Sequence, residues 1–96
     1  MSSYLVSAEA QEDIDGIADY TLKAWGWRQS GQYLAKLEDS FSLLADHPSI
    51  GRPSDSIRAG LRRFETGRHV VFYLPDSDGI LIVRVLHQQV LPGSFA

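Results

Sequence analysis

The sequence predicts an α+β fold in which an antiparallel helical hairpin packs against a small sheet. Its first half carries two stretches whose apolar residues recur every three or four positions, the spacing of amphipathic helices. Its second half carries three strand-like runs separated by short turns, the pattern of an antiparallel meander. A short apolar run, Tyr4 to Val6, precedes the first helical stretch and predicts an N-terminal strand.

The two helices are expected on either side of Gly26. The first is predicted to begin after Ser7, whose hydroxyl can cap it, and to end at Gly26, which can adopt a positive φ. The second is predicted to begin near Arg28 or Gln29 and to end before Pro48. So short a connection makes the helices antiparallel, and a sheet must cover their apolar stripes, which comprise Ile14, Ile17, Ala18, Thr21 and Trp25, then Tyr33, Leu34, Leu37, Phe41, Leu44 and Ala45.

The three later strands are predicted over residues 61–65, 68–74 and 79–87, after a loop over residues 47–55. The last strand is apolar on both sides except at Arg84, which predicts a central position in the sheet. Strict alternation puts Arg84 on one face and His87 on the other. It also assigns Leu81, Val83 and Val85 to one face, and Ile80, Ile82, Arg84 and Leu86 to the opposite face.

Composition narrows the function classes. A chain of 96 residues with 44% hydrophobic residues is expected to form a single domain, 1–96, and the absence of cysteine excludes disulfide scaffolds and thiolate metal sites. No basic leader or apolar run of about 20 residues is present, so a cytoplasmic protein without membrane contact is expected.

Charge is unevenly distributed along the chain. The net charge of −3 argues against a bulk nucleic-acid binder, and sequence-specific nucleic-acid binding is not expected. Residues 1–48 hold eight acidic and three basic residues, whereas residues 49–96 hold four acidic residues and six arginines. Arginine suits bidentate contacts with carboxylates or phosphates, so the second half predicts either ordinary surface charge or a face that meets an acidic partner.

The sequence contains few motifs that are typical of catalytic, metal or cofactor sites. The histidines lack metal-ligand spacing, and no phosphate-binding or nucleophile-elbow motif occurs, so neither a metal nor a cofactor is expected. One group could act on RNA, because arginine stabilises a phosphorane while histidine or tyrosine moves protons. It comprises Arg62, Arg63, Arg68, His69, Tyr73, Arg84 and His87, and the simpler interpretation is that these are surface or partner-facing side chains.

Several segments resemble the ParE branch of the ParE/RelE toxins over roughly residues 4–89. The most specific are Ile50-Gly51-Arg52, then Ile57-Arg58 with Gly60-Leu61-Arg62, and Val83-Arg84-Val85-Leu86-His87-Gln88. Further matches are Asp13-Ile14, Tyr20-Thr21, Trp25-Gly26, Tyr33, Leu37, Phe41, Leu44-Ala45, Pro48, Asp55, His69 and Phe72-Tyr73. The tail 90–96 departs from the charged ending that is usual in the family.

The resemblance implies a bacterial type II toxin that traps the cleavage complex of DNA gyrase, without catalysis of its own. It also implies a ParD-like antitoxin with a ribbon-helix-helix N-terminus and an acidic helical C-terminus. Two alternatives stay open, namely a ribosome-dependent mRNA endoribonuclease of the RelE type, carried by Arg62, Arg84 and His87, and a non-toxic remnant that only binds antitoxin.

Two sets of contact residues follow for these partners. The family's antitoxins pack apolar side chains on the toxin while their acidic residues meet its arginines, and the matching residues are Trp27, Tyr33, Leu37, Arg58, Arg62, Arg68 and Arg84. The surface directed at gyrase, or at RNA in the alternative, is expected at Arg62, Arg63, His69, Tyr73, Arg84, His87 and Gln88.

Overall fold

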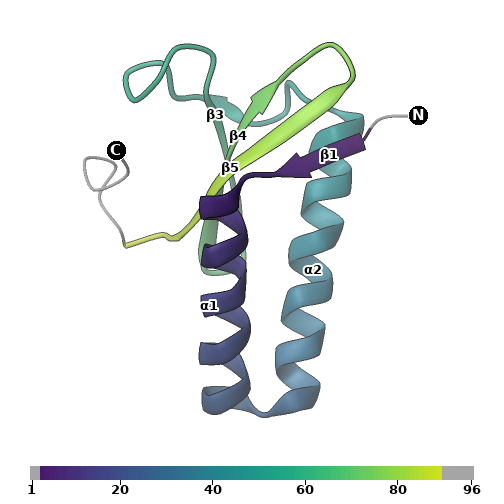
Figure 1. The fold of residues 1–96 in the computed structure, drawn as a ribbon, viewed down its shortest axis with the longest axis vertical. Coiled ribbons are helices and arrows are strands. Elements are labelled where there is room, and N and C mark those ends of the chain that lie inside the picture. Colours follow the sequence, from purple (N-terminus) through teal and green to yellow (C-terminus); the bar gives the residue numbers. More distant parts are fainter. Residues whose placement is uncertain (1–2, 90–96) are drawn as a thin grey trace.

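The computed structural model describes residues 3–89 and confirms the α+β fold (Figure 1). The helices are α1 (Ala8–Trp25) and α2 (Trp27–Asp46), and the strands are β1 (Ser3–Val6), β2 (Arg52–Pro53), β3 (Arg62–Thr66), β4 (His69–Pro75) and β5 (Gly79–His87). The atypical tail 90–96 lies outside the described residues. Within those residues, neither helix is long and apolar enough to span a membrane.

The strands form one sheet in the order β1-β5-β4-β3-β2. β1 pairs with β5 in parallel, and the other pairs are antiparallel, so β5 lies between β1 and β4 as predicted. The expectation of an uninterrupted loop over 47–55 was wrong, because Arg52 and Pro53 pair with β3 as the short strand β2. A proline is tolerated there because β2 is the last strand of the sheet.

Both ends of α1 follow from local sequence. The Ser7 hydroxyl oxygen accepts a hydrogen bond from the Ala10 N–H at 3.0 Å, which confirms the predicted cap. The same hydroxyl donates to the Val83 carbonyl at 2.8 Å and so joins the start of α1 to β5. Gly26 has a φ of 88° and separates the two helices, and α2 begins directly after it at Trp27.

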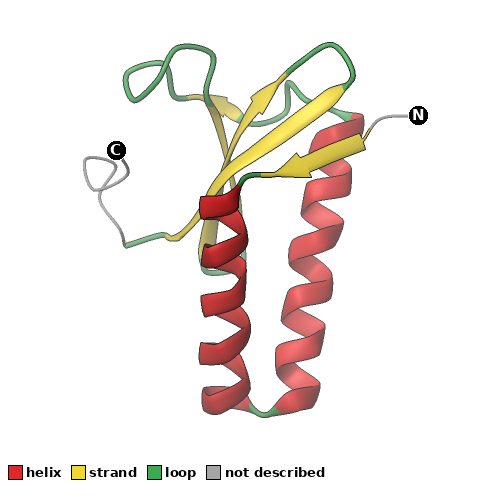
Figure 2. Ribbon diagram, in the orientation of Figure 1, coloured by secondary structure: helices red, strands yellow, loops and turns green. Residues whose placement is uncertain are grey.

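The helical hairpin covers one face of the sheet, and its turn lies far from β1 (Figure 2). The main core is enclosed between the hairpin and the strands, and a smaller apolar cluster lies on the opposite face of the sheet. The main core comprises Ala10, Ile17, Leu37, Phe41, Leu44, Ala45, Val71, Tyr73, Ile80, Ile82 and Val85.

A register shift in the β4–β5 ladder changes which residues of β5 share a face. Phe72 pairs with Arg84 whereas Tyr73 pairs with Ile82, so Val83 is an extra residue in β5. The assignment of Val83 and Val85 to one face was therefore wrong. Val85 joins Ile80 and Ile82 in the main core, and Val83 joins Leu86 in the cluster on the opposite face.

Candidate functional site

A groove of about 450 Å³ lies between α1 and the adjoining ends of β4 and β5, and we refer to it as the α1–β5 groove. The α1 wall includes Gly16, Ile17, Tyr20 and Trp25, whereas the other wall is formed by Arg68, His69, Val85, Leu86 and His87. Glu12 and Asp13 lie at the edge contributed by the first half of α1. Among the described residues, no three potential ligands gather to form a metal site.

A chain of aromatic contacts crosses the strand side of this groove. The Tyr33 hydroxyl lies 2.5 Å from His69 Nδ1, and the His69 and His87 rings meet edge to face with centroids 5.5 Å apart. The Tyr33 oxygen also accepts the Arg68 backbone N–H at 3.0 Å, which leaves its own proton to be donated to His69 Nδ1. Neutral His69 would then carry its proton on Nε2.

The environment of His69 favours this neutral form. Burial lowers the pKa of His69, and the nearby His87 and Arg68 lower it further, while Asp13 acts in the opposite direction. His69 and His87 share one face of the sheet because they pair directly across β4 and β5. His69 is half-buried and His87 is exposed, so the two rings differ in their access to water.

Trp25 lies at the end of the groove that is nearest the turn between the helices. Its ring contacts Tyr33 edge to face at 5.4 Å, and the Arg68 guanidinium lies over it at 5.2 Å. The expectation of a core tryptophan was wrong, because Trp25 is only partly buried. The Arg68 guanidinium covers part of the ring instead of the sheet.

Arg84 forms an ion pair within the chain. Its Nε and Nη2 atoms donate to the two carboxylate oxygens of Asp13 at 2.7 and 2.9 Å, and the Val85 N–H donates to Asp13 Oδ2 at 2.9 Å. The hydrogen bond with Asp13 raises the pKa of Arg84. The Arg84 guanidinium is thus held by a carboxylate of α1, and its role as a contact for a partner stays a prediction.

We use the term outer face for the sheet surface opposite the helices. Leu5, Leu81 and Leu74 are paired across β1, β5 and β4, and Arg63, Phe72 and Arg84 are paired across β3, β4 and β5. Among the described residues, only the segment 54–61 covers part of this face, through Ile57 and Leu61. Leu5 is 70% exposed.

Two of the predicted surface residues anchor the loop before β2. Tyr73 Oη donates to the Pro48 carbonyl at 2.7 Å and accepts from the Gly51 N–H at 2.9 Å, while Arg62 Nη1 donates to the Gly51 carbonyl at 2.6 Å. Tyr73 is fully buried, and burial raises the pKa of its hydroxyl. Tyr73 was therefore wrong as a contact for gyrase or RNA, because its position in β4 directs it into the main core.

The remaining predicted residues differ in how deeply they are buried. Leu37 is only 2% exposed and was wrong as an antitoxin anchor, because the stripe on which it lies faces the sheet. Trp27 is 73% exposed at the start of α2, and Arg58 is exposed on the segment 54–61. Gln88 joins the turn after β5 to the turn before β4, since its backbone N–H donates to the Arg68 carbonyl at 3.0 Å.

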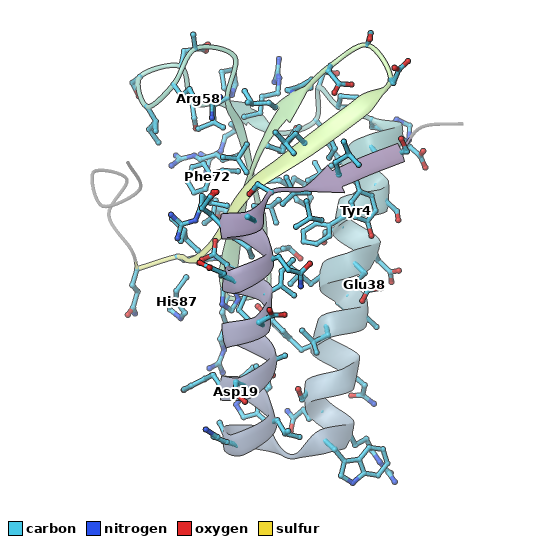
Figure 3. The ribbon with its side chains drawn as sticks, in the orientation of Figure 1. Tyr4, Asp19, Glu38, Arg58, Phe72 and His87 are labelled. Atoms are coloured by element: carbon cyan, nitrogen blue, oxygen red, sulfur yellow. The ribbon has the colours of Figure 1, made fainter. Side chains whose placement is uncertain are left out.

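Six of the predicted residues occupy three separate parts of the surface. Arg68, His69 and His87 meet at the α1–β5 groove, and Arg63 and Arg84 lie on the outer face. Arg58 lies on the loop at the top of Figure 3, well away from His87. Sequence reasoning missed Asp13 as the partner of Arg84 and Gly16 as the open wall of the groove. A glycine within an amphipathic helix was the available signal for Gly16.

The chain matches the family described as ParE toxin of type II toxin-antitoxin system, parDE, over residues 4–92. The chain belongs to the ParE toxin family. Toxin ParE1 of Caulobacter vibrioides is 39% identical over 90 residues, covering 94% of this chain and 93% of that protein. Toxin ParE1 of Mycobacterium tuberculosis is 41% identical, with 93% and 92% covered. Toxin ParE of Escherichia coli is 34% identical, with 94% and 88% covered.

A solved structure shares the ParE fold. A chain of the chromosomal ParDE TA system from P. aeruginosa superposes with a TM-score of 0.75 at 21% identity, covering 91% of this chain and 96% of that one. At this identity the likeness concerns the fold, and it agrees with the α+β architecture that the sequence predicted. The assignment to a ParE toxin of a type II toxin–antitoxin system rests on the family match and the relatives.

Proposed function

We propose that this ParE toxin acts in the cytoplasm by binding DNA gyrase and trapping its cleavage complex, and that a ParD-like antitoxin holds it inactive. Membership of the ParE family and relatives named ParE at 34–41% identity support the proposal. A binding protein with no catalysis of its own needs an accessible surface that fits another protein. The outer face provides one, and this observation carries the proposal.

The outer face has the composition of a protein-binding surface. Apolar side chains from β1, β4 and β5 lie beside Arg63 and the Arg84–Asp13 pair, and Phe72 is buried beneath them. Interfaces between proteins commonly combine an apolar centre with arginine at its border. We assign the gyrase contact to this face, with Leu5, Arg63, Leu81 and Leu86 as contact residues.

The arrangement of the arginines favours binding over RNA cleavage. Arg62 donates to the loop carbonyl of Gly51, Arg84 is paired with Asp13, and Tyr73 is buried in the core. His87 lies on the helix side of the sheet, whereas Arg84 lies on the outer face. Both arginines of the nuclease alternative are therefore already bonded to groups within the chain, which supports a binding role over RNA cleavage.

The decisive test uses purified toxin with gyrase, ATP and supercoiled plasmid. We expect linear, cleaved DNA to accumulate, and we expect no new mRNA cuts in translating ribosomes. Ribosome-dependent cuts without gyrase cleavage would establish the endoribonuclease alternative instead. If the toxin is inactive in both assays and its expression without antitoxin leaves growth unaffected, the chain is a remnant that only binds antitoxin.

A pair of leucine variants tests the assignment to the outer face. Leu5→Glu places a charge on the outer face, whereas Leu43→Glu places the same charge on α2, and the wild-type leucines are 70% and 43% exposed. We expect Leu5→Glu to reduce gyrase-dependent cleavage at least tenfold and Leu43→Glu to change it less than threefold. Equal effects of the two variants would move the gyrase contact away from the outer face.

A further inference from the structure

We propose that Arg63 binds a backbone phosphate of the DNA that gyrase holds in its cleavage complex. The inference rests on the proposed function and deepens it, because it separates two contacts on the outer face. The leucines of that face meet gyrase itself, whereas Arg63 meets the DNA. The basis is a row of arginines across the sheet, a buried donor of Arg63 within that row, and the energetic requirement for trapping a complex.

Three arginines form a row across the outer face, on strands β2, β3 and β5. Arg52 is paired with Arg63, and Arg63 is paired through Phe72 of β4 with Arg84. Neighbouring strands lie about 4.8 Å apart, so the row is about 14 Å long. Like charges directly opposite each other destabilise a sheet, so the pairing of Arg52 with Arg63 is unfavourable for the chain alone.

Arg63 is the member of the row that the chain does not neutralise. Arg52 forms an ion pair with Glu65, and a carboxylate of α1 holds Arg84. Among the described residues, Arg63 takes part in no ion pair. Its Nε atom is buried and has no hydrogen-bond partner within that part of the chain. A donor that leaves water without gaining an acceptor lowers stability, which indicates that the missing acceptor comes from a partner.

A hollow beside Arg63 leaves room for an anion. Its volume is about 420 Å³, and it lies at the edge formed by β2 and β3, where Arg52 and Arg63 both line it. Glu65 also lines the hollow, but its carboxylate is neutralised by Arg52. A guanidinium can hold a phosphate through two parallel hydrogen bonds, so this edge of the outer face suits a phosphate group.

The requirement for trapping favours a DNA phosphate over a carboxylate of gyrase. A ligand shifts an equilibrium only by the difference between its affinities for the two states. A contact with DNA favours the DNA-bound enzyme, from which the cleavage complex forms, whereas a carboxylate on an unchanged gyrase surface is bound equally in both states. The net charge of −3 opposes binding to free DNA, so the phosphate contact is expected only where gyrase holds the DNA. Such a contact carries no sequence information.

The experiment measures the affinity of fluorescently labelled toxin for gyrase alone and for gyrase bound to a DNA duplex, by anisotropy. Arg63→Gln removes the charge on the outer face, and Arg28→Gln makes the same change on an exposed arginine at the start of α2. Both affinities are measured at several salt concentrations, because each phosphate contact contributes to the salt dependence of binding. Circular dichroism verifies that each variant is folded.

We expect Arg63→Gln to weaken binding to the gyrase–DNA complex at least tenfold and binding to gyrase alone less than threefold. The slope of log affinity against log salt for the complex should decrease in magnitude by about one, as expected for the loss of one phosphate contact. Arg28→Gln should change both affinities less than threefold.

Equal losses with and without DNA would assign Arg63 to a carboxylate of gyrase and overturn the proposal. A folded Arg63→Gln protein that binds the gyrase–DNA complex within threefold of wild type would overturn it too. The wild-type slope provides a check that does not depend on the variant, because it should be steeper for the complex than for gyrase alone, and equal slopes reject the phosphate contact. Wild-type toxin that binds neither form of gyrase contradicts the proposed function itself.

Discussion

The Asp13 carboxylate joins helix α1 to strand β5 through three hydrogen bonds. Two come from the Arg84 guanidinium and one from the Val85 N–H, and the side chains of Asp13 and Arg84 are 14% and 25% exposed. A partly buried pair of this kind contributes little when its desolvation is counted, but losing one partner is costly because the other keeps its desolvation penalty.

Asp13→Ala should therefore lower the free energy of unfolding by about 2–4 kcal/mol. Asp15→Ala, which removes an exposed carboxylate two residues away, should change it by less than about 0.5 kcal/mol. Urea unfolding followed by circular dichroism measures both. Equal stabilities of the two variants would mean that the pair with Arg84 does not hold α1 on the sheet.

His69 should make stability depend on pH. Burial lowers its pKa in the folded chain below the ordinary value of 6.5, so the unfolded state binds the proton more readily. The contribution of neutral His69 is present above pH 6.5 and is lost as the pH falls below that value. The hydrogen bond from Tyr33 to Nδ1 acts in the same sense, because a protonated ring cannot accept it.

His69→Gln should reduce the loss of stability between pH 7.5 and pH 5, since the amide does not titrate. Urea unfolding of wild type and variant at both pH values provides the comparison. A variant that loses as much stability as wild type on acidification would show that His69 does not titrate differently on folding.

At the scale of the elements, strong periodicity made the two helices and the three long strands predictable. Each spans enough residues for a repeat of 3.6 or 2 to be recognised, and Ser7 and Gly26 mark the helix ends by their chemistry. β2 was missed because two residues contain no period. The extra residue Val83 was missed because a bulge depends on the partner strand, which local alternation does not contain.

The candidate site was less predictable than the fold, because it also depends on how distant segments of the chain pair. Arg68, His69 and His87 meet because β4 and β5 pair in a particular register, and Arg84 finds Asp13 across 71 positions of sequence. Periodicity identified the buried stripe of α2 correctly, so Leu37 could have been excluded as a surface anchor. Excluding Tyr73 as a surface contact would have required knowing which face of β4 the helices cover.

Glycines in two different elements should respond in opposite ways to alanine. Gly16 lies within α1, where a Cβ meets open space, so Gly16→Ala should stabilise the chain by about 0.5–1 kcal/mol through helix propensity. A Cβ at Gly51 would overlap the Tyr73 hydroxyl and lie 2.8 Å from the Arg63 carbonyl oxygen. Gly51→Ala should therefore destabilise the chain by about 1–3 kcal/mol.

Thermal unfolding distinguishes the two glycine variants, because 1 kcal/mol corresponds to a shift of about 4–8 °C in Tm for a chain of this size. We expect Tm to rise for Gly16→Ala and to fall for Gly51→Ala. A fall in Tm for Gly16→Ala would mean that α1 packs against something at this position, and the α1–β5 groove would then not be open.

At the scale of the whole molecule, three contacts join the helical hairpin to the sheet at different positions along its length. The Ser7 hydroxyl bonds to Val83 at the start of α1, and Asp13 bonds to Arg84 and Val85 along its first half. The Tyr33 hydroxyl of α2 bonds to His69 near the turn between the helices. The main core draws on both helices and on β4 and β5, with Tyr4 and Val6 of β1 packed against it.

Because neither layer can bury its apolar face alone, we propose that the chain folds as one domain and unfolds in a single cooperative step. Far-UV circular dichroism reports mainly the helices, and the fluorescence of Trp25 reports the contact of the hairpin with Tyr33 and Arg68. A Trp27→Phe background removes the signal of the exposed tryptophan. The two probes should give the same urea midpoint and the same m value. If the fluorescence transition precedes the loss of helix, the hairpin separates from the sheet before it unfolds, and the chain contains two units of stability.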